Sequence, residues 1–139
     1  MEEEISDNII MAKIEHIAIW VKDLEKMKTF YQYYFNADAG NKYVNIRKKY
    51  ASYFINFSGE SRIELMQRSD IINLPDKSLE YYGWAHIALS LGSKEKVIKL
   101  TEKFRKDGYA IIGEPRITGD GYFESVVMDP EGNRIELTI

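Results

Sequence analysis

The feature that most constrains this chain is an internal repeat. Residues 14–19 read Ile-Glu-His-Ile-Ala-Ile, residues 84–89 read Trp-Ala-His-Ile-Ala-Leu, and Arg-Ile-Glu-Leu occurs at both 62–65 and 134–137. These matches are separated by 70 and 72 residues and keep their order, which indicates two copies of one folding unit. We therefore expect an N-terminal extension at residues 1–12 and a single domain at 13–139. Within that domain, module one spans 13–66, a linker spans 67–82 and module two spans 83–139.

Each copy has the pattern of a βαβββ unit. A strand-like run opens the copy, and a helix signal follows, with Asp23 as the expected N-cap in the first copy and Ser93 in the second. Apolar side chains recur at helical spacing after each cap, and Asp107 with Gly108 supplies a helix stop. Turns at 58–60 and 129–132 precede each Arg-Ile-Glu-Leu segment. The shorter strand candidates are 43–47, 52–57 and 62–66 in the first copy, then 110–112, 123–128 and 133–138 in the second. The expected fold class is α+β, with two tandem βαβββ modules.

Composition excludes several classes of function. The chain has 139 residues and no cysteine, so it can form neither a disulfide nor a thiolate metal site. A net charge of −3 does not provide the positive field that a nucleic-acid partner requires. No apolar run approaches the roughly 18 residues that cross a bilayer, and the acidic start does not resemble a signal peptide. We expect a cytoplasmic protein with no nucleic-acid or membrane partner.

Strand alternation places both histidines of the chain in equivalent positions. Ile17 and Ile19 share one face of the first strand, so His16 points to the other face, together with Ala18 and Trp20. That second face is also apolar, which predicts a strand buried on both sides and a histidine in a lined interior. His86 repeats this situation in the second module.

Glu64 and Glu136 likewise alternate with apolar residues, each about 50 positions after a histidine. A histidine on a buried strand is commonly a hydrogen-bonded core residue, and a glutamate in such a pattern is commonly solvated. The repetition of both residues favours another interpretation. If the two copies close into one curved sheet, two imidazoles and two carboxylates converge, and a divalent cation would compensate the buried charges.

The chain resembles the vicinal oxygen chelate superfamily, which includes glyoxalase I, bleomycin-resistance proteins, fosfomycin-resistance enzymes, methylmalonyl-CoA epimerase and extradiol dioxygenases. The resemblance covers residues 13–139. It rests on the His16 strand with the following Val-Lys-Asp-Leu at 21–24 and Phe-Tyr at 30–31, on the strand at 84–88, and on Asp-Pro-Glu-Gly-Asn-Arg-Ile-Glu at 129–136. It implies paired modules that form an open, U-shaped and partly closed mixed sheet around a metal site.

The resemblance also implies a ligand set and a reaction. By position, His16, Glu64, His86 and Glu136 would hold one divalent ion per subunit: nickel, zinc, cobalt or manganese. This set implies a metal-dependent lyase or isomerase of glyoxalase I type, which moves a proton next to a metal-bound carbonyl through an enediolate. Since the chain has no third histidine, the base is expected among the ligands. We select Glu136, at the end of the chain, and expect Glu64 to remain the firmer ligand.

Two departures from the family pattern concern the substrate. Bacterial glyoxalase I usually has an arginine and an asparagine that reach glutathione where this chain has Trp20 and Arg68. We therefore expect a small-molecule substrate other than the glutathione hemithioacetal. Arg68, and Arg116 in the loop expected before Gly119, could attract a carboxylate or serve only as surface residues. The expected pocket walls, which could equally be ordinary core, are Trp20, Trp84, Tyr122 and Phe123.

A rival interpretation is a metal-free binding protein of the same fold, of the antibiotic-resistance type. Ten tyrosines and two tryptophans favour it, and a complete ligand set opposes it. In either case we expect a homodimer, because open modules leave edge strands that a second chain can cover. The sequence leaves open whether one subunit or two would build each metal site.

Overall fold

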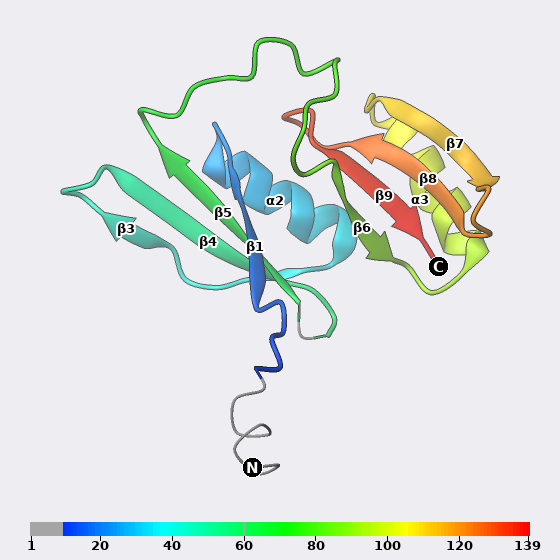
Figure 1. Ribbon diagram of the computed structural model, residues 1–139, viewed down its shortest axis with the longest axis horizontal. Helices are drawn as coiled ribbons and strands as arrows, with labels where there is room; N and C mark the ends of the chain where they lie inside the picture. The colour runs from blue at the N-terminus through cyan, green and yellow to red at the C-terminus, as the bar shows by residue number, and fades with distance from the viewer. Residues whose placement is uncertain (1–9, 60) are drawn as a thin grey trace, which may run out of the picture.

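The computed structural model describes residues 10–59 and 61–139 and contains two consecutive modules, each with a helix after its first strand (Figure 1). Residues 1–9 of the expected N-terminal extension and Glu60 of the expected turn lie outside the described residues. The first module consists of β1 (His16–Trp20), α2 (Leu24–Phe35), β2 (Asp38–Ala39), β3 (Tyr43–Asn45), β4 (Tyr50–Asn56) and β5 (Arg62–Arg68). The second consists of β6 (His86–Ser90), α3 (Lys94–Lys106), β7 (Ile111–Ile117), β8 (Phe123–Met128) and β9 (Arg134–Thr138).

Both helices begin at the predicted caps. A carboxylate oxygen of Asp23 accepts a hydrogen bond from the backbone N–H of Lys26 at 3.0 Å, and the hydroxyl of Ser93 accepts from Lys96 N at 3.2 Å. These bonds satisfy N–H groups that have no partner within the first turn of a helix. Helix α3 ends at Lys106 with Asp107 as its C-cap, and Gly108 follows with a φ of 89°, which glycine adopts without steric cost.

The strands form two separate mixed sheets. Their orders are β1-β5-β4-β2, with β3 added to β4, and β6-β9-β8-β7. In each module the first and last strands run parallel, with Ala18 opposite Glu64 and Ala88 opposite Glu136. The remaining pairs are antiparallel, so the α+β class and the two tandem modules are confirmed. Neither sheet is closed, and β1 and β6 are edge strands of their sheets.

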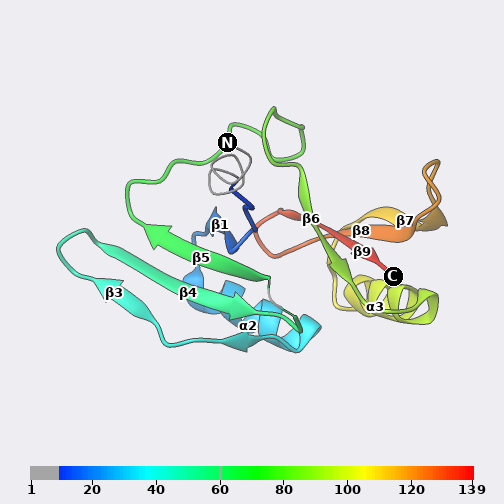
Figure 2. The same ribbon diagram turned by 60° about the horizontal axis from the view of Figure 1, so that its bottom comes forward.

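Aromatic side chains of α2 join the two modules. Tyr34 stacks on Phe104 of α3 with ring centroids 4.4 Å apart, and Phe30 contacts the same ring at 5.7 Å. Tyr109, which follows α3, lies 5.5 Å from both Phe30 and Tyr34. Figure 2 shows the consequence: the sheets lie beside each other, with α2 and α3 on the same side of them. Neither α2 nor α3 therefore covers the opposite face of the sheets.

The turn before β9 provides a second junction, through a buried carboxylate. Asp129 is only 3% exposed and accepts hydrogen bonds from the Tyr31 hydroxyl, from the backbone N–H groups of Glu131 and Asn133, and from the Asn133 amide. Burial raises the pKa of Asp129 above its usual value, although the Asn133 bonds oppose this shift. The turn also places Glu131 against the start of α2, where it accepts from Lys22 N at 2.7 Å and Asp23 N at 2.9 Å.

Some details differ from the expectations. Arg116 was expected in a loop. It lies in β7 instead, because the strand continues to Ile117 and Arg116 pairs with Glu124 of β8. The two-residue strand β2 was not predicted, since so short a segment carries no alternation signal. The expected linker lies largely at the surface without regular structure. No helix among the described residues is long and apolar enough to cross a bilayer.

We predict that Asp129→Ala lowers the free energy of unfolding by about 3 kcal/mol, because it leaves several buried donors without an acceptor. Urea denaturation monitored by circular dichroism measures this change. Asp120→Ala is the matched control: Asp120 lies in an exposed turn, where it accepts a hydrogen bond from Thr118, and the expected loss is below about 0.5 kcal/mol. Equal losses in the two variants would contradict the proposed role of the turn.

Candidate functional site

Each module presents one histidine beside one glutamate on the sheet face opposite its helix. Parallel pairing places His16 and Glu64 on one side of the first sheet, with Nε2 of His16 3.9 Å from Oε1 of Glu64. In the second sheet, Nε2 of His86 lies 3.1 Å from Oε2 of Glu136. The repeat in the sequence is thus a repeat of chemical groups at equivalent positions. We call these the module-one pair and the module-two pair.

The expectation that both histidines lie in a lined interior is wrong for the single chain. The side chains of His16 and His86 are 37% and 42% exposed, whereas Glu64 and Glu136 are each 17% exposed. The reason is topological: β1 and β6 are edge strands, and among residues 10–59 and 61–139 no second layer covers their outer face. Because both faces of each strand carry apolar residues, the sequence predicted burial on both sides. Among the described residues, only the face toward the helix is covered.

The two pairs do not meet within one chain. Across residues 10–59 and 61–139, no group of three or more histidine, aspartate or glutamate side chains is arranged to hold a metal ion. The two imidazoles and two carboxylates were expected to converge if the two copies closed into a single curved sheet. The modules instead form two sheets. One chain therefore presents two half-sites, each with one imidazole and one carboxylate.

A further carboxylate orients the module-one histidine. Nδ1 of His16 lies 2.6 Å from Oε2 of Glu15, so the ring presents Nε2 toward Glu64. Glu15 also forms an ion pair with Arg62, whose guanidinium lies 4.1 Å from the centroid of the Phe54 ring. Carboxylates that bond the second nitrogen of a metal-binding imidazole set its tautomer and its basicity. Glu15 was not identified from the sequence, although its position next to His16 was a usable signal.

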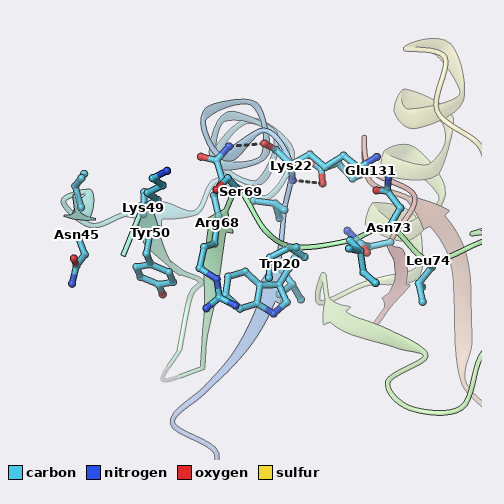
Figure 3. A pocket seen from close by; sticks show the side chains of 18 of the residues that line it. Trp20, Lys22, Asn45, Lys49, Tyr50, Arg68, Ser69, Asn73, Leu74 and Glu131 are labelled. Atoms are coloured by element: carbon cyan, nitrogen blue, oxygen red, sulfur yellow. Dashed lines mark hydrogen bonds between the residues drawn. The ribbon is translucent and has the colours of Figure 1, made fainter. Parts of the chain in front are cut away.

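Tyr50 connects the module-one pair to a row of side chains on the same face. Its hydroxyl donates to Oε2 of Glu64 at 3.5 Å, and its ring lies 6.3 Å from Trp20, edge to face. Burial is the main cause that raises the pKa of Tyr50, so the phenol stays protonated and can donate. The guanidinium of Arg68 lies 4.8 Å from the Trp20 ring centroid (Figure 3). The structure thus brings together Trp20 and Arg68, two of the predicted substrate-binding residues.

A second carboxylate, that of Glu124, accompanies the module-two pair. Glu124 of β8 lies on the same face as Glu136, because Val126 is the residue opposite Glu136. A hydrogen bond between the two carboxyls, followed by burial and charge repulsion, raises the pKa of Glu124 to about 7. Arg116 donates to the backbone carbonyl of Glu124 at 3.2 Å. Strand alternation could have identified Glu124, since it stands two residues before Val126 in a recognised strand.

The remaining predicted substrate residues are dispersed. Trp84 is 93% exposed. Together with His86 it lines a cavity of about 380 Å³ between the modules. Tyr122 is 61% exposed in the turn before β8. Phe123 packs against the core on the helix side, with the Lys94 ammonium 5.0 Å from its ring centroid, and so lies on the face opposite Glu124.

Comparison with known proteins places these features in a family context. The family model described as Glyoxalase/Bleomycin resistance protein/Dioxygenase superfamily matches residues 13–137. Among solved structures, the trypanothione-dependent glyoxalase I of Leishmania major has a TM-score of 0.73 at 24% identity, over 92% of this chain and 86% of that one. A glyoxalase family protein from Enterococcus faecalis has a TM-score of 0.74 at 20% identity, over 91% and 97%.

Glyoxalase I from Zea mays has a TM-score of 0.72 at 24% identity, over 91% of this chain. The present chain spans only 44% of that protein. No match is found among curated protein sequences. At these identities the structural matches establish a shared fold, while activity has to be inferred from the side chains of this chain.

Proposed function

This chain belongs to the Glyoxalase/Bleomycin resistance protein/Dioxygenase superfamily, and from that premise we propose that it is a metal-dependent lyase or isomerase of glyoxalase I type. The observation that carries the proposal is the occurrence of the same histidine–glutamate pair at equivalent places in both modules. A binding module without a metal has no need for two such pairs. In the proposed reaction, a proton leaves the carbon next to a carbonyl group of a small molecule and returns to the adjacent carbon.

The donor set fits a divalent cation. Two neutral imidazoles and two carboxylates suit nickel, zinc, cobalt or manganese, and the two carboxylates balance the charge of the ion. His16, Glu64, His86 and Glu136 would hold it. When bound, such an ion polarises a carbonyl oxygen of the substrate and thereby acidifies the neighbouring C–H group.

We propose that two chains build each site. Since the pairs of one chain do not meet, the module-one pair of one chain would face the module-two pair of a second chain. A two-fold axis repeats this contact, so a homodimer contains two equivalent sites. Two observations support a second chain on this face of the sheets. The edge strands β1 and β6 are exposed, and so are the apolar side chains beside the pairs: Ile14, Trp20 and Trp84.

The two carboxylates have different surroundings, which supports different roles. Glu64 accepts a hydrogen bond from Tyr50, which restrains it. Glu136 faces the carboxyl of Glu124, and repulsion between the two groups favours movement of Glu136 once both are ionised. We assign Glu136 as the group that takes the proton from the substrate and returns it to the adjacent carbon, and Glu64 as the stationary ligand.

The metal prediction is a stoichiometry of about one divalent ion per chain after loading with nickel, zinc, cobalt or manganese. His16→Ala and His86→Ala should each lower the bound metal strongly, because each removes one of four ligands. Elemental analysis after gel filtration measures the content, and Glu114→Gln, an exposed acid paired with Arg105, serves as the control. A stoichiometry that survives the double histidine substitution would refute the ligand assignment.

The two-chain prediction is tested with complementary variants. One carries His16→Ala with Glu64→Gln, and the other carries His86→Ala with Glu136→Gln. Neither should bind metal alone, whereas a hybrid dimer contains one intact site, so random mixing restores about a quarter of the wild-type metal content. Light scattering verifies the dimer. A monomer at micromolar concentration, or no restoration in verified hybrids, would contradict the two-chain site.

The reaction prediction concerns carbonyl compounds incubated with the metal-loaded protein in deuterated water. Deuterium should enter at the carbon next to the carbonyl, and Glu136→Gln should reduce this exchange by about 100-fold or more while metal still binds. Because Trp20 and Arg68 replace the glutathione contacts, activity on the methylglyoxal–glutathione hemithioacetal should be weak. Absence of exchange across the panel, together with a tightly bound aromatic ligand, would favour the binding-protein alternative.

A further inference from the structure

A cavity of about 750 Å³ lies beside the ends of β1 and β5, and Tyr50, whose hydroxyl donates to Glu64, is one of its lining residues. One wall is the β3–β4 hairpin with Val44 and Ile46, and the other is the segment after β5 with Ile72 and Leu74. Figure 3 shows Trp20, Tyr50 and Arg68 between these walls. The cavity is thus bounded by two loops that are far apart in the sequence and by the outer face of the first sheet.

The walls of this cavity are apolar side chains that the single chain leaves in water. Val44 and Leu74 are about half exposed, at 54% and 51%, and Ile46 and Ile72 are almost fully exposed, at 87% and 89%. Four such side chains around one concavity, with an indole ring between them, favour an apolar or aromatic ligand segment.

Cationic side chains outnumber acids around the same cavity. Its basic lining residues are Lys22, Lys49, Arg68 and Lys77, and its acidic one is Glu131. The carboxylate of Glu131 is already bound by the backbone N–H groups of Lys22 and Asp23, which commits it to the start of α2. The cavity therefore presents net positive charge to a ligand.

Arg68 is the cation best placed to bind an anion there. Its guanidinium is held over Trp20, and its Nε donates to Asp70 at 2.5 Å. This bond occupies Nε, and within the part of the chain that the structure describes the two terminal nitrogens donate no other hydrogen bond. A guanidinium held by a ring and a carboxylate is oriented in advance, and its planar donor group matches a carboxylate. Lys49 also lines the cavity, but its side chain points away from the Arg68 guanidinium (Figure 3), whereas Tyr50 lies opposite Arg68 in the strand register.

The contact from Glu64 through Tyr50 and Trp20 to Arg68 joins this cavity to the metal pair. We infer that the cavity binds the anionic end of the substrate, which is an organic carboxylate with an apolar segment between the carboxylate and the reacting carbonyl. This inference rests on the proposed function for its link to the reaction, and it names the substrate class. Arg68 would bind the carboxylate, and Trp20 with Ile46 and Leu74 would contact the apolar segment.

The test measures binding to metal-free protein in the presence of EDTA, so that no ion can bind the probe. The probes are 4-phenylbutyrate and its neutral analogue 4-phenylbutan-1-ol. A Trp84→Phe background leaves Trp20 as the only tryptophan, and quenching of its fluorescence reports occupancy of the cavity. We expect the carboxylate to bind about tenfold or more tightly than the alcohol, as for a charged hydrogen bond.

Arg68→Gln should abolish this preference while leaving the binding of the alcohol nearly unchanged. The matched control is Arg47→Gln, which removes the same charge at a position outside the cavity lining. Arg68→Lys tests geometry, because it keeps the charge and loses the planar donor group. Equal affinities of the two probes in the parent protein, or an equal loss in the control, would overturn the inference.

The outcome is separable from that of the proposed function. Saturable, charge-selective quenching without metal binding or deuterium exchange would leave the carboxylate site standing and refute the enzyme. Metal binding and exchange without charge selectivity would refute the carboxylate site alone.

Discussion

Parallel pairing of the first and last strands of each module is the constraint on which the rest of this structure depends. Antiparallel neighbours can be joined by a short turn, whereas parallel neighbours need a crossover, which here consists of the module's helix and its other strands. The same pairing fixes the register in which Ala18 lies opposite Glu64 and Ala88 opposite Glu136. In each module the histidine precedes this alanine by two positions on the same strand, so its side chain and that of the glutamate lie on one face of the sheet. The chemistry of both half-sites follows from this register.

The junction between modules decides where those half-sites point. Tyr34 and Phe30 of α2 pack on Phe104 of α3, and the buried Asp129 ties the last turn to Tyr31. Both helices therefore lie on one side of the two sheets (Figure 2). The strand register places both polar pairs on the other side. This arrangement buries the helix side well and leaves β1 and β6 as open edges. One chain therefore presents two separate half-sites. The proposed function includes a second chain because each complete site needs one pair from each of two chains.

The sequence allowed some site residues to be predicted and left others unrecognised for identifiable reasons. His16, Glu64, His86 and Glu136 were identified because strand alternation and the repeat act on short, local segments. Glu124 follows from the same alternation rule. Tyr50 and the cavity walls do not, because they depend on how far the β3–β4 hairpin and the segment after β5 extend over the sheet, and loops carry no periodic signal.

What the sequence by itself determined is the unit: two βαβββ modules, their caps and turns, and which side chains share a strand face. These properties arise from backbone stereochemistry over a few residues, so they can be read without knowledge of the rest of the chain. Only the tertiary structure decided that the modules form two sheets, that the histidines are exposed, and that Arg68 lies over Trp20 beside a cavity. Those outcomes depend on which surfaces pack together. Apolar strand faces attract any apolar partner, and the pattern of a strand does not specify which one it meets.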